Sequence, residues 1–261
     1  YQNSKSTTSV IASRMNFIFD IDGTISNNGR NLDINNEKAI FKILESCHNV
    51  IFASARPVRD MLPLLNPAFH KCLMIGCNGG ICYKNGNFDK THHFEKTQIT
   101  DIVNFLDTKN IPYVLDGDWY YSFSKAKHPF QDYIRSLGKY EMQNSQLIDM
   151  GITKLLVLDY SIKTELTSFL EKNNVIYSLN NHTKDNLFDI TPNKNNKYIA
   201  LKESGIDMDS SICFGNDEND FQMLENAKHS IFVSGENTFD KATMNIPFEK
   251  VHKVIESFLK D

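Results

Sequence analysis

Short apolar stretches alternate with stretches of helical periodicity in the first third of the chain. Residues 15–19, 50–53 and 73–76 are runs of mostly apolar residues with the length of a buried strand. Between the first two runs, over residues 35–47, apolar positions recur at the spacing of one helical face. This strand, helix, strand order predicts a parallel sheet covered by helices on both faces.

The pattern changes after residue 82 and returns near residue 188. The intervening stretch contains an Asn-Gly hairpin signal at Asn85-Gly86, followed by strands and helices with apolar residues of their own. It therefore reads as an α+β unit inserted into an α/β core. We expect three parts: a disordered or vector-derived leader (1–14), a discontinuous core (15–82 and 188–261) and an inserted domain (83–187).

Composition and charge exclude several classes of protein. Of 261 residues, 41% are hydrophobic and 23% are charged, as in ordinary globular proteins. The 28 basic and 32 acidic side chains leave a net charge of −4, so the basic surplus of a nucleic-acid-binding protein is missing. No apolar run approaches the roughly 20 residues that span a bilayer. Five cysteines without a CxxC pair argue against a disulfide framework and favour a reducing cytoplasm.

The strongest candidate site follows the first predicted strand, in the sequence Asp20-Ile21-Asp22-Gly23-Thr24. Alternate residues of an extended chain point to the same side, so the two carboxylates can converge. They lie at the carboxyl end of a parallel strand, where open α/β sheets bind ligands. Because two neighbouring carboxylates repel each other, a divalent cation is the natural third partner.

Further polar groups follow other predicted strands. The Ser54 hydroxyl and adjacent backbone N–H groups, such as that of Ala55, suit a phosphate oxygen. Lys197 opens a predicted helix, where its ammonium can neutralise phosphate charge. The loop of residues 215–220 concentrates the oxygen ligands that Mg²⁺ prefers. Each feature alone is typical of a turn or a surface, but their joint occurrence after strands indicates one phosphate and metal site.

The order of these features resembles the four motifs of the haloacid dehalogenase superfamily. The chain is most similar to its Cof-type (class IIB) phosphatases, whose Asn-Gly strand is matched at Asn78-Gly79 and whose Pro-x-x-x-x-Lys segment is matched from Pro192 to Lys197. The resemblance covers essentially residues 15–261. It implies a Rossmann-like core with a parallel sheet flanked by helices. Because the α+β insertion lies between Ser54 and Lys197, it implies a cap domain of the C2B type.

The resemblance also implies a function and roles. The expected enzyme is a Mg²⁺-dependent phosphatase of small phosphorylated metabolites, sugar phosphates first, as a monomer or weak homo-oligomer. Asp20 would be the nucleophile that forms an aspartyl-phosphate, and Asp22 the general acid and base. Asp220 would orient Lys197 or metal-bound water. The groups implied to hold the phosphate are Ser54, Ala55, Lys197 and Asn219.

One position departs from the family pattern and leaves alternatives open. The commoner fourth motif has Asp where this chain has Asn216, and a carboxylate follows at Asp217. The implied metal ligands are Asp20, the Asp22 carbonyl and either Asn216 or Asp217; we expect Asp217 to bind, directly or through water. One alternative function is a phosphomutase, which would return the phosphoryl group to a sugar. The other, favoured only by Asn216, is a catalytically weak ligand-sensing protein.

Overall fold

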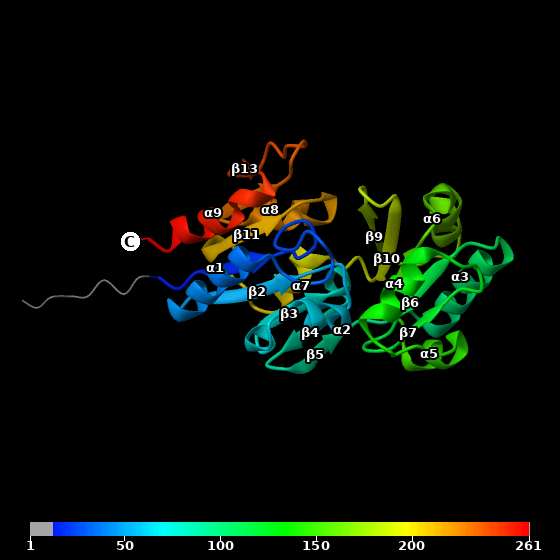
Figure 1. The fold of residues 1–261 in the computed structure, drawn as a ribbon. Coiled ribbons are helices and arrows are strands. Elements are labelled where there is room, and N and C mark those ends of the chain that lie inside the picture. The colour runs from blue at the N-terminus through cyan, green and yellow to red at the C-terminus, as the bar shows by residue number, and fades with distance from the viewer. Residues whose placement is uncertain (1–12, 261) are drawn as a thin grey trace, which may run out of the picture.

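The computed structural model describes residues 13–260, and in this part of the chain the strands form two sheets (Figure 1). The larger sheet has eight strands, in the order β13 (Met244–Ile246), β12 (His229–Val233), β11 (Ser211–Gly215), β1 (Asn16–Phe19), β2 (Asn49–Ala53), β3 (Leu73–Gly76), β4 (Ile81–Lys84) and β5 (Asn87–Thr91). The smaller sheet is antiparallel, in the order β7 (Tyr121–Phe123), β6 (Tyr113–Asp116), β8 (Lys154–Val157), β10 (Leu187–Pro192) and β9 (Tyr177–His182).

Alternate residues of β1 enter two separate apolar layers of the larger sheet. Phe17 and Phe19 pack on one face and Ile18 on the other. The helices of the first face are α1 (Ile34–Glu45), α2 (Val58–Met61) and α9 (Val251–Phe258), and those of the second are α7 (Lys197–Glu203) and α8 (Phe221–Asn226). The strands from β13 to β3 are parallel, so the predicted α/β fold is confirmed.

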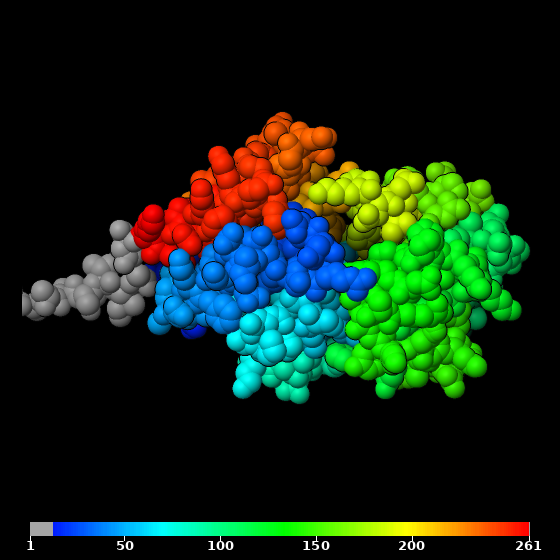
Figure 2. Space-filling model, in the orientation of Figure 1, coloured from blue at the N-terminus to red at the C-terminus, as the bar shows by residue number. Residues whose placement is uncertain are grey.

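Helices also cover both faces of the smaller sheet. One face packs against α3 (Lys96–Thr108), α5 (Asn144–Met150) and α6 (Lys163–Lys172). The other packs against α4 (Pro129–Leu137), which begins at a capping box made by His128 and Gln131. Helix α4 also touches the larger-sheet unit, because Tyr133 Oη donates to Gly29 O at 2.6 Å and Arg30 Nη1 donates to Ser136 Oγ at 3.2 Å. Figure 2 shows the loop that follows β1, in blue, in contact with the smaller-sheet unit, in green.

The carboxyl ends of the central parallel strands bring the candidate residues to one edge. Asp20 follows β1, Ser54 follows β2 and Asn216 follows β11, and these strands are neighbours in the sheet. The smaller sheet lies beside this edge, on the right in Figure 1. The position of each polar residue directly after a parallel strand therefore explains why these three residues lie close together.

Near both expected boundaries of the inserted domain, the strands pair with a different sheet from the one predicted. The pattern predicts an insertion from residue 83, yet β4 and β5 extend the larger sheet by antiparallel pairing onto β3. It predicts that the core resumes at residue 188, yet β10 pairs with β8 and β9. A hairpin can extend a parallel sheet at its edge, and β10 is buried throughout, like a parallel core strand. The division into two domains stays a prediction.

Two further expectations concern the termini and the membrane. Most of the predicted leader, 1–14, lies outside the described residues. In the part of the chain that the structure describes, none of the helices combines the length and apolar character needed to cross a bilayer.

Gly79, in the turn after β3, provides a test of this packing. Its φ is +110°, and a Cβ atom there would lie 2.5 Å from the Asn196 carbonyl oxygen. We expect Gly79→Ala to lower the free energy of unfolding by about 3 kcal/mol, because backbone strain and a backbone clash add. Urea denaturation measures this loss.

Two matched glycines separate the two causes. Gly205 has φ +78° with open space around its Cβ position, and Gly235 has open space and no positive φ. Gly205→Ala should cost about 1 kcal/mol from strain alone, and Gly235→Ala less than about 0.5 kcal/mol. Equal losses in all three variants would contradict the assignment of a clash at Gly79.

Candidate active site

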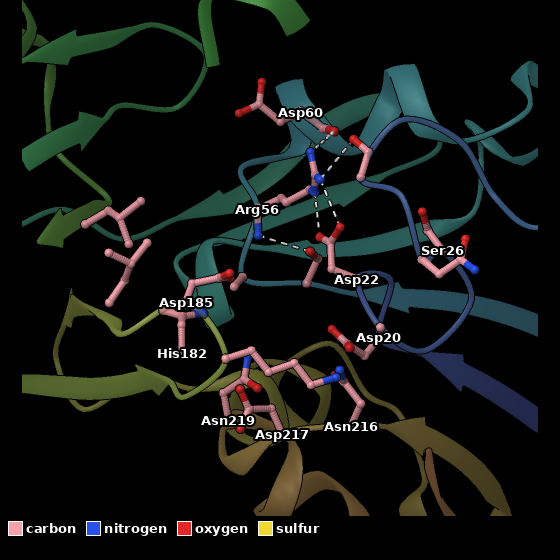
Figure 3. A pocket seen from close by; sticks show the side chains of 18 of the residues that line it. Asp20, Asp22, Ser26, Arg56, Asp60, His182, Asp185, Asn216, Asp217 and Asn219 are labelled. Carbon is pink, nitrogen blue, oxygen red and sulfur yellow. Dashed lines mark hydrogen bonds and ion pairs between the residues drawn. The ribbon is translucent and has the colours of Figure 1, made fainter. Parts of the chain in front are cut away.

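A cavity of about 650 Å³ opens between the carboxyl edge of the larger sheet and the smaller sheet (Figure 3). All predicted site residues except Lys197 and Asp220 line it: Asp20, Asp22, Ser54, Ala55, Asn216, Asp217 and Asn219. The smaller sheet and α4 contribute charged, polar and apolar side chains to the opposite wall, among them Asp116, Tyr133, Lys154, Leu156, His182 and Lys184. The structure thus brings the predicted residues together in one place.

Asp20 is buried at the bottom of this cavity and is held from two sides. One carboxylate oxygen accepts from Lys197 Nζ at 2.9 Å, and the other accepts from Thr24 Oγ1 at 3.0 Å. Burial and the nearby Asp220 charge raise the pKa of Asp20, Lys197 lowers it, and the net result is a pKa of about 7. The side chain predicted as nucleophile therefore ionises at a cost that a nearby cation would reduce.

Lys197 and Asp220 lie behind Asp20. Lys197 Nζ donates to Asp220 at 2.7 Å, and both side chains are at most 1% exposed. The two carboxylates beside it raise the pKa of Lys197 above its ordinary value despite the opposing effect of burial. Asp220 also accepts from the backbone N–H of Asn216 at 2.9 Å, which closes the acidic loop. The geometry fits the expected orienting role of Asp220 and keeps Lys197 charged next to Asp20.

Asp22 is bound by an arginine that the sequence interpretation assigns no role. Arg56 Nε and Nη2 donate to the two Asp22 carboxylate oxygens at 2.6 and 2.9 Å. The same guanidinium donates to Tyr133 Oη of α4 at 2.6 Å. This two-bond fork keeps the Asp22 carboxylate turned toward Arg56. Since 46% of the Asp22 side chain is exposed, it has room to turn away.

Ser54 and Ala55 form a turn that is fixed from the smaller sheet. Ser54 Oγ accepts from the backbone N–H of Arg56 at 3.0 Å, and Ser54 is buried. Lys154, a buried lysine of β8, donates to the Ala55 carbonyl oxygen at 2.8 Å and lies 3.5 Å from Asp116. The backbone of this turn is thereby held at the edge of the cavity.

The acidic loop gives its two candidate metal ligands different environments. The Asn216 side chain lies against Gly23, so close that a Cβ atom on Gly23 would overlap the amide. Gly23 also has φ +80°, a backbone conformation that favours glycine, and any side chain there would displace the Asn216 amide. The Asp217 carboxylate instead accepts from the Glu218 backbone N–H at 2.8 Å and from Thr183 Oγ1 at 2.8 Å. The choice between Asn216 and Asp217 as the metal ligand stays a prediction.

Asn219 connects the site to a buried carboxylate of the smaller sheet. Its Nδ2 donates to Asn78 Oδ1 at 3.0 Å, and Asn78 Nδ2 donates to Asp189 at 2.9 Å. His182 Nε2 donates to the same Asp189 oxygen at 2.6 Å. Burial opposes ionisation of Asp189, but the bond and charge of His182, with Lys154, keep its pKa below the ordinary value.

A second buried cluster ties α2 to the smaller sheet. Arg59 donates to Asp60 at 2.9 Å and to Asp116 of β6 at 2.9 Å, and all three side chains are at most 5% exposed. It also donates to the Trp119 carbonyl oxygen at 2.9 Å. Removing one partner of such a cluster would leave a buried charge uncompensated. The walls of the cavity are therefore joined by specific ion pairs.

Comparison with known proteins adds the family. A family model of haloacid dehalogenase-like hydrolases matches residues 17–248. The chain belongs to the haloacid dehalogenase-like hydrolase family. The resemblance inferred from the motifs is confirmed, and so is the expectation of an enzyme of the hydrolase class.

Individual relatives of this hydrolase are distant in sequence but match it end to end. The phosphoglycolate phosphatase of Methanobrevibacter smithii is 23% identical over 249 residues, covering 92% of this chain and 96% of the relative. A solved structure from Thermotoga maritima has a TM-score of 0.77 at 21% identity, covering 95% and 99% of the two chains. A sugar phosphatase of HAD subclass IIB also scores 0.77, at 15% identity, covering 94% and 98%. The structural likenesses confirm the fold.

Several residues of this hydrolase's site were outside the predicted set. Lys154 begins the apolar strand β8, and Asp189 lies inside the mostly apolar strand β10, so each charge interrupts an apolar pattern that the sequence shows. Arg56 follows the Ser54 turn directly. Arg59 and Asp60 carry no such signal, because their partner Asp116 lies on a strand far away in the sequence.

The buried Asp20 of this hydrolase predicts a pH-dependent stability. Its folded pKa of about 7 lies above the unfolded value of 3.8, so its contribution is fully present below about pH 4 and is lost as pH rises through 7. Asp20→Asn removes this loss. We expect its stability advantage over wild type, in EDTA, to grow between pH 5 and pH 8 by at most about 3 kcal/mol.

Thermal unfolding at the two pH values measures this change. Asp185→Asn, which removes an exposed carboxylate of the same cavity, is the control. An Asp20→Asn advantage that is the same at pH 5 and pH 8 would contradict the assignment.

Proposed function

We propose that this hydrolase is a phosphatase that removes the phosphoryl group from small phosphorylated metabolites through an aspartyl-phosphate. The observation that carries the proposal is the buried Asp20 at the cavity floor, held by Lys197 at 2.9 Å, with Asp22 two residues further on. A carboxylate fixed beside an ammonium, in a cavity that also presents the Ser54 turn, is arranged for attack on an anionic phosphoryl group.

In the first step, an Asp20 carboxylate oxygen forms a bond to phosphorus as the bond to the leaving oxygen breaks. Asp22, starting as the protonated carboxylic acid, donates its proton to the leaving oxygen and becomes a carboxylate. The Ser54 hydroxyl, the Ala55 turn and Asn219 would hold the phosphoryl oxygens. Lys197 would offset the charge of Asp20 and Asp220 behind them.

In the second step, Asp22 takes a proton from water, and the water oxygen attacks phosphorus. The bond from phosphorus to Asp20 breaks, so inorganic phosphate leaves and the carboxylate is restored. Both steps require Asp22 to face the phosphoryl group. It would first have to leave Arg56, whose two bonds hold it at 2.6 and 2.9 Å. We therefore infer that the acid–base role involves a rotation of the Asp22 side chain.

The residues present fit Mg²⁺. Asp20, the Asp22 carbonyl and the Asn216 amide offer oxygen ligands only, which a hard cation prefers. In residues 13–260 no cluster of three or more His, Cys, Asp or Glu side chains suits a metal, so a neutral amide or backbone oxygen has to complete the set. We propose Asn216 for this position, because Asp217 is bound to Glu218 and Thr183. Bound Mg²⁺ would supply positive charge to the phosphoryl oxygens.

The substrate class rests on the cavity and the relatives together. Two relatives are described as a phosphoglycolate phosphatase and a sugar phosphatase, whose names both point to small phosphomonoesters. A cavity of about 650 Å³ accommodates molecules of that size. We place sugar phosphates first, with phosphoglycolate-like acids second.

Release of inorganic phosphate from a panel of phosphorylated metabolites, with Mg²⁺ or EDTA, tests the function. We expect Mg²⁺-dependent turnover that falls by about 10³-fold or more in Asp20→Asn, because the nucleophile is lost. The control, Asp185→Asn, removes another cavity carboxylate and should stay within a few-fold of wild type.

Other outcomes would favour the alternatives. Transfer of the phosphoryl group from one sugar phosphate to another, without phosphate release, would indicate a phosphomutase. Ligand binding without either reaction, in folded protein, would indicate the sensor.

The metal assignment has its own test by calorimetric titration with MgCl₂. Asn216→Asp adds a negative charge to the proposed ligand set and should tighten Mg²⁺ binding by about tenfold. Asp217→Asn is the matched change and should alter the affinity less than about twofold. The assignment is wrong if only Asp217→Asn changes Mg²⁺ binding.

A further inference from the structure

The turn between β9 and β10 docks onto the acidic loop of the larger-sheet unit. Thr183 donates to Asp217 twice, from Oγ1 at 2.8 Å and from its backbone N–H at 3.3 Å. Asn181 Nδ2 donates to Glu218 Oε2 at 3.2 Å beside it. These three bonds fix the tip of the β9–β10 hairpin over the loop that carries Asn216.

Lys184, the next residue of the turn, extends into the cavity. Its ammonium nitrogen lies 3.5 Å from the position that a Cβ atom on Gly23 would take, and the Asn216 amide flanks the same point. Gly23 directly follows Asp22, and Lys184 lines the cavity together with Asp20. A cation carried by the smaller sheet thus reaches the residues proposed to perform the chemistry.

The Lys184 ammonium is free to bind an anion. Among residues 13–260, it has no carboxylate oxygen within the 4.0 Å of an ion pair, whereas Lys197 and Arg56 are each paired with carboxylates. The Asn216 side chain that flanks the same point is a neutral amide and does not neutralise this charge. The neutral amide leaves the positive charge available.

We propose that Lys184 contacts an oxygen of the substrate phosphoryl group, and that the Thr183–Asp217 contact positions it. The inference rests on the proposed phosphatase function. A phosphoryl group in transfer spreads its charge over its outer oxygens, so a cation from the wall opposite Lys197 would stabilise it from the other side. Lys184 would act only when the hairpin is docked, which links the chemistry to the placement of the smaller sheet.

The test compares Lys184→Ala with Lys172→Ala, which removes the same charge from the exposed surface of α6. We expect Lys184→Ala to lower kcat/KM by about 30-fold or more. The loss should be similar for a hexose phosphate and for phosphoglycolate, since both present the same phosphoryl group. Calorimetry in EDTA should show about fivefold weaker binding of inorganic phosphate, with Lys172→Ala unchanged in both measurements.

Three outcomes would overturn the proposal. A loss confined to phosphoglycolate would place Lys184 on the second anionic group of the substrate. Wild-type kcat/KM in Lys184→Ala would remove it from the reaction. Unchanged affinity of Lys184→Ala for inorganic phosphate would exclude the contact, even if the wild-type protein hydrolyses no compound of the panel. Absence of wild-type hydrolysis would by itself count only against the phosphatase function.

Thr183→Val tests the positioning step, because it removes the hydroxyl bond to Asp217 and keeps the shape of the side chain. We expect kcat/KM to fall about fivefold in the wild-type background and not at all in the Lys184→Ala background. An equal fall in both backgrounds would show that Thr183 acts independently of Lys184, against the proposal.

Discussion

The site depends on one buried arrangement of charge, in which Lys197 lies between Asp20 and Asp220. A single ammonium faces two carboxylates, and all three side chains are almost completely buried. Removing Lys197 would leave two buried carboxylates without compensation. Because Asp20 follows β1 while Lys197 opens α7 after the whole inserted stretch, these contacts join both segments of the larger-sheet unit. The negative charge of Asp220 contributes to the raised pKa of Asp20. The excess of one negative charge in this arrangement therefore favours the binding of a further cation.

The smaller sheet is joined to this arrangement by polar contacts. Arg59 reaches Asp116, and Asn78 reaches Asp189, each between buried side chains. Apolar layers pack within each unit, on the faces of its own sheet. Polar pairs are directional, so they fix the relative position of the two walls more sharply than apolar contact would. A cavity bounded by such pairs presents its side chains to a substrate in a defined geometry.

Much of the fold and the site was predictable from the order of residues, because parallel strands end at one edge. Asp20, Ser54 and Asn216 meet for that reason alone. Other features depend on tertiary packing. The membership of β10 was unpredictable, since a strand buried on both faces has the same pattern in either sheet. The strands β12 and β13 and the helix α9, which complete the sheet and its cover, lie in a stretch that the sequence assigns to the core without resolving its elements.

In the acidic loop, the carboxylate at Asp217 binds the opposite wall of the cavity, while position 216 carries a neutral amide. The loop has an amide at Asn216 and a carboxylate at Asp217, and the carboxylate holds Thr183 of the opposite wall. A carboxylate at position 216 would add a negative charge to the part of the cavity that Lys184 reaches. With the amide there, the negative charge of the loop secures the hairpin, and the hairpin delivers a positive charge to the cavity. The departure from the family pattern and the approach of Lys184 are therefore two parts of one electrostatic arrangement.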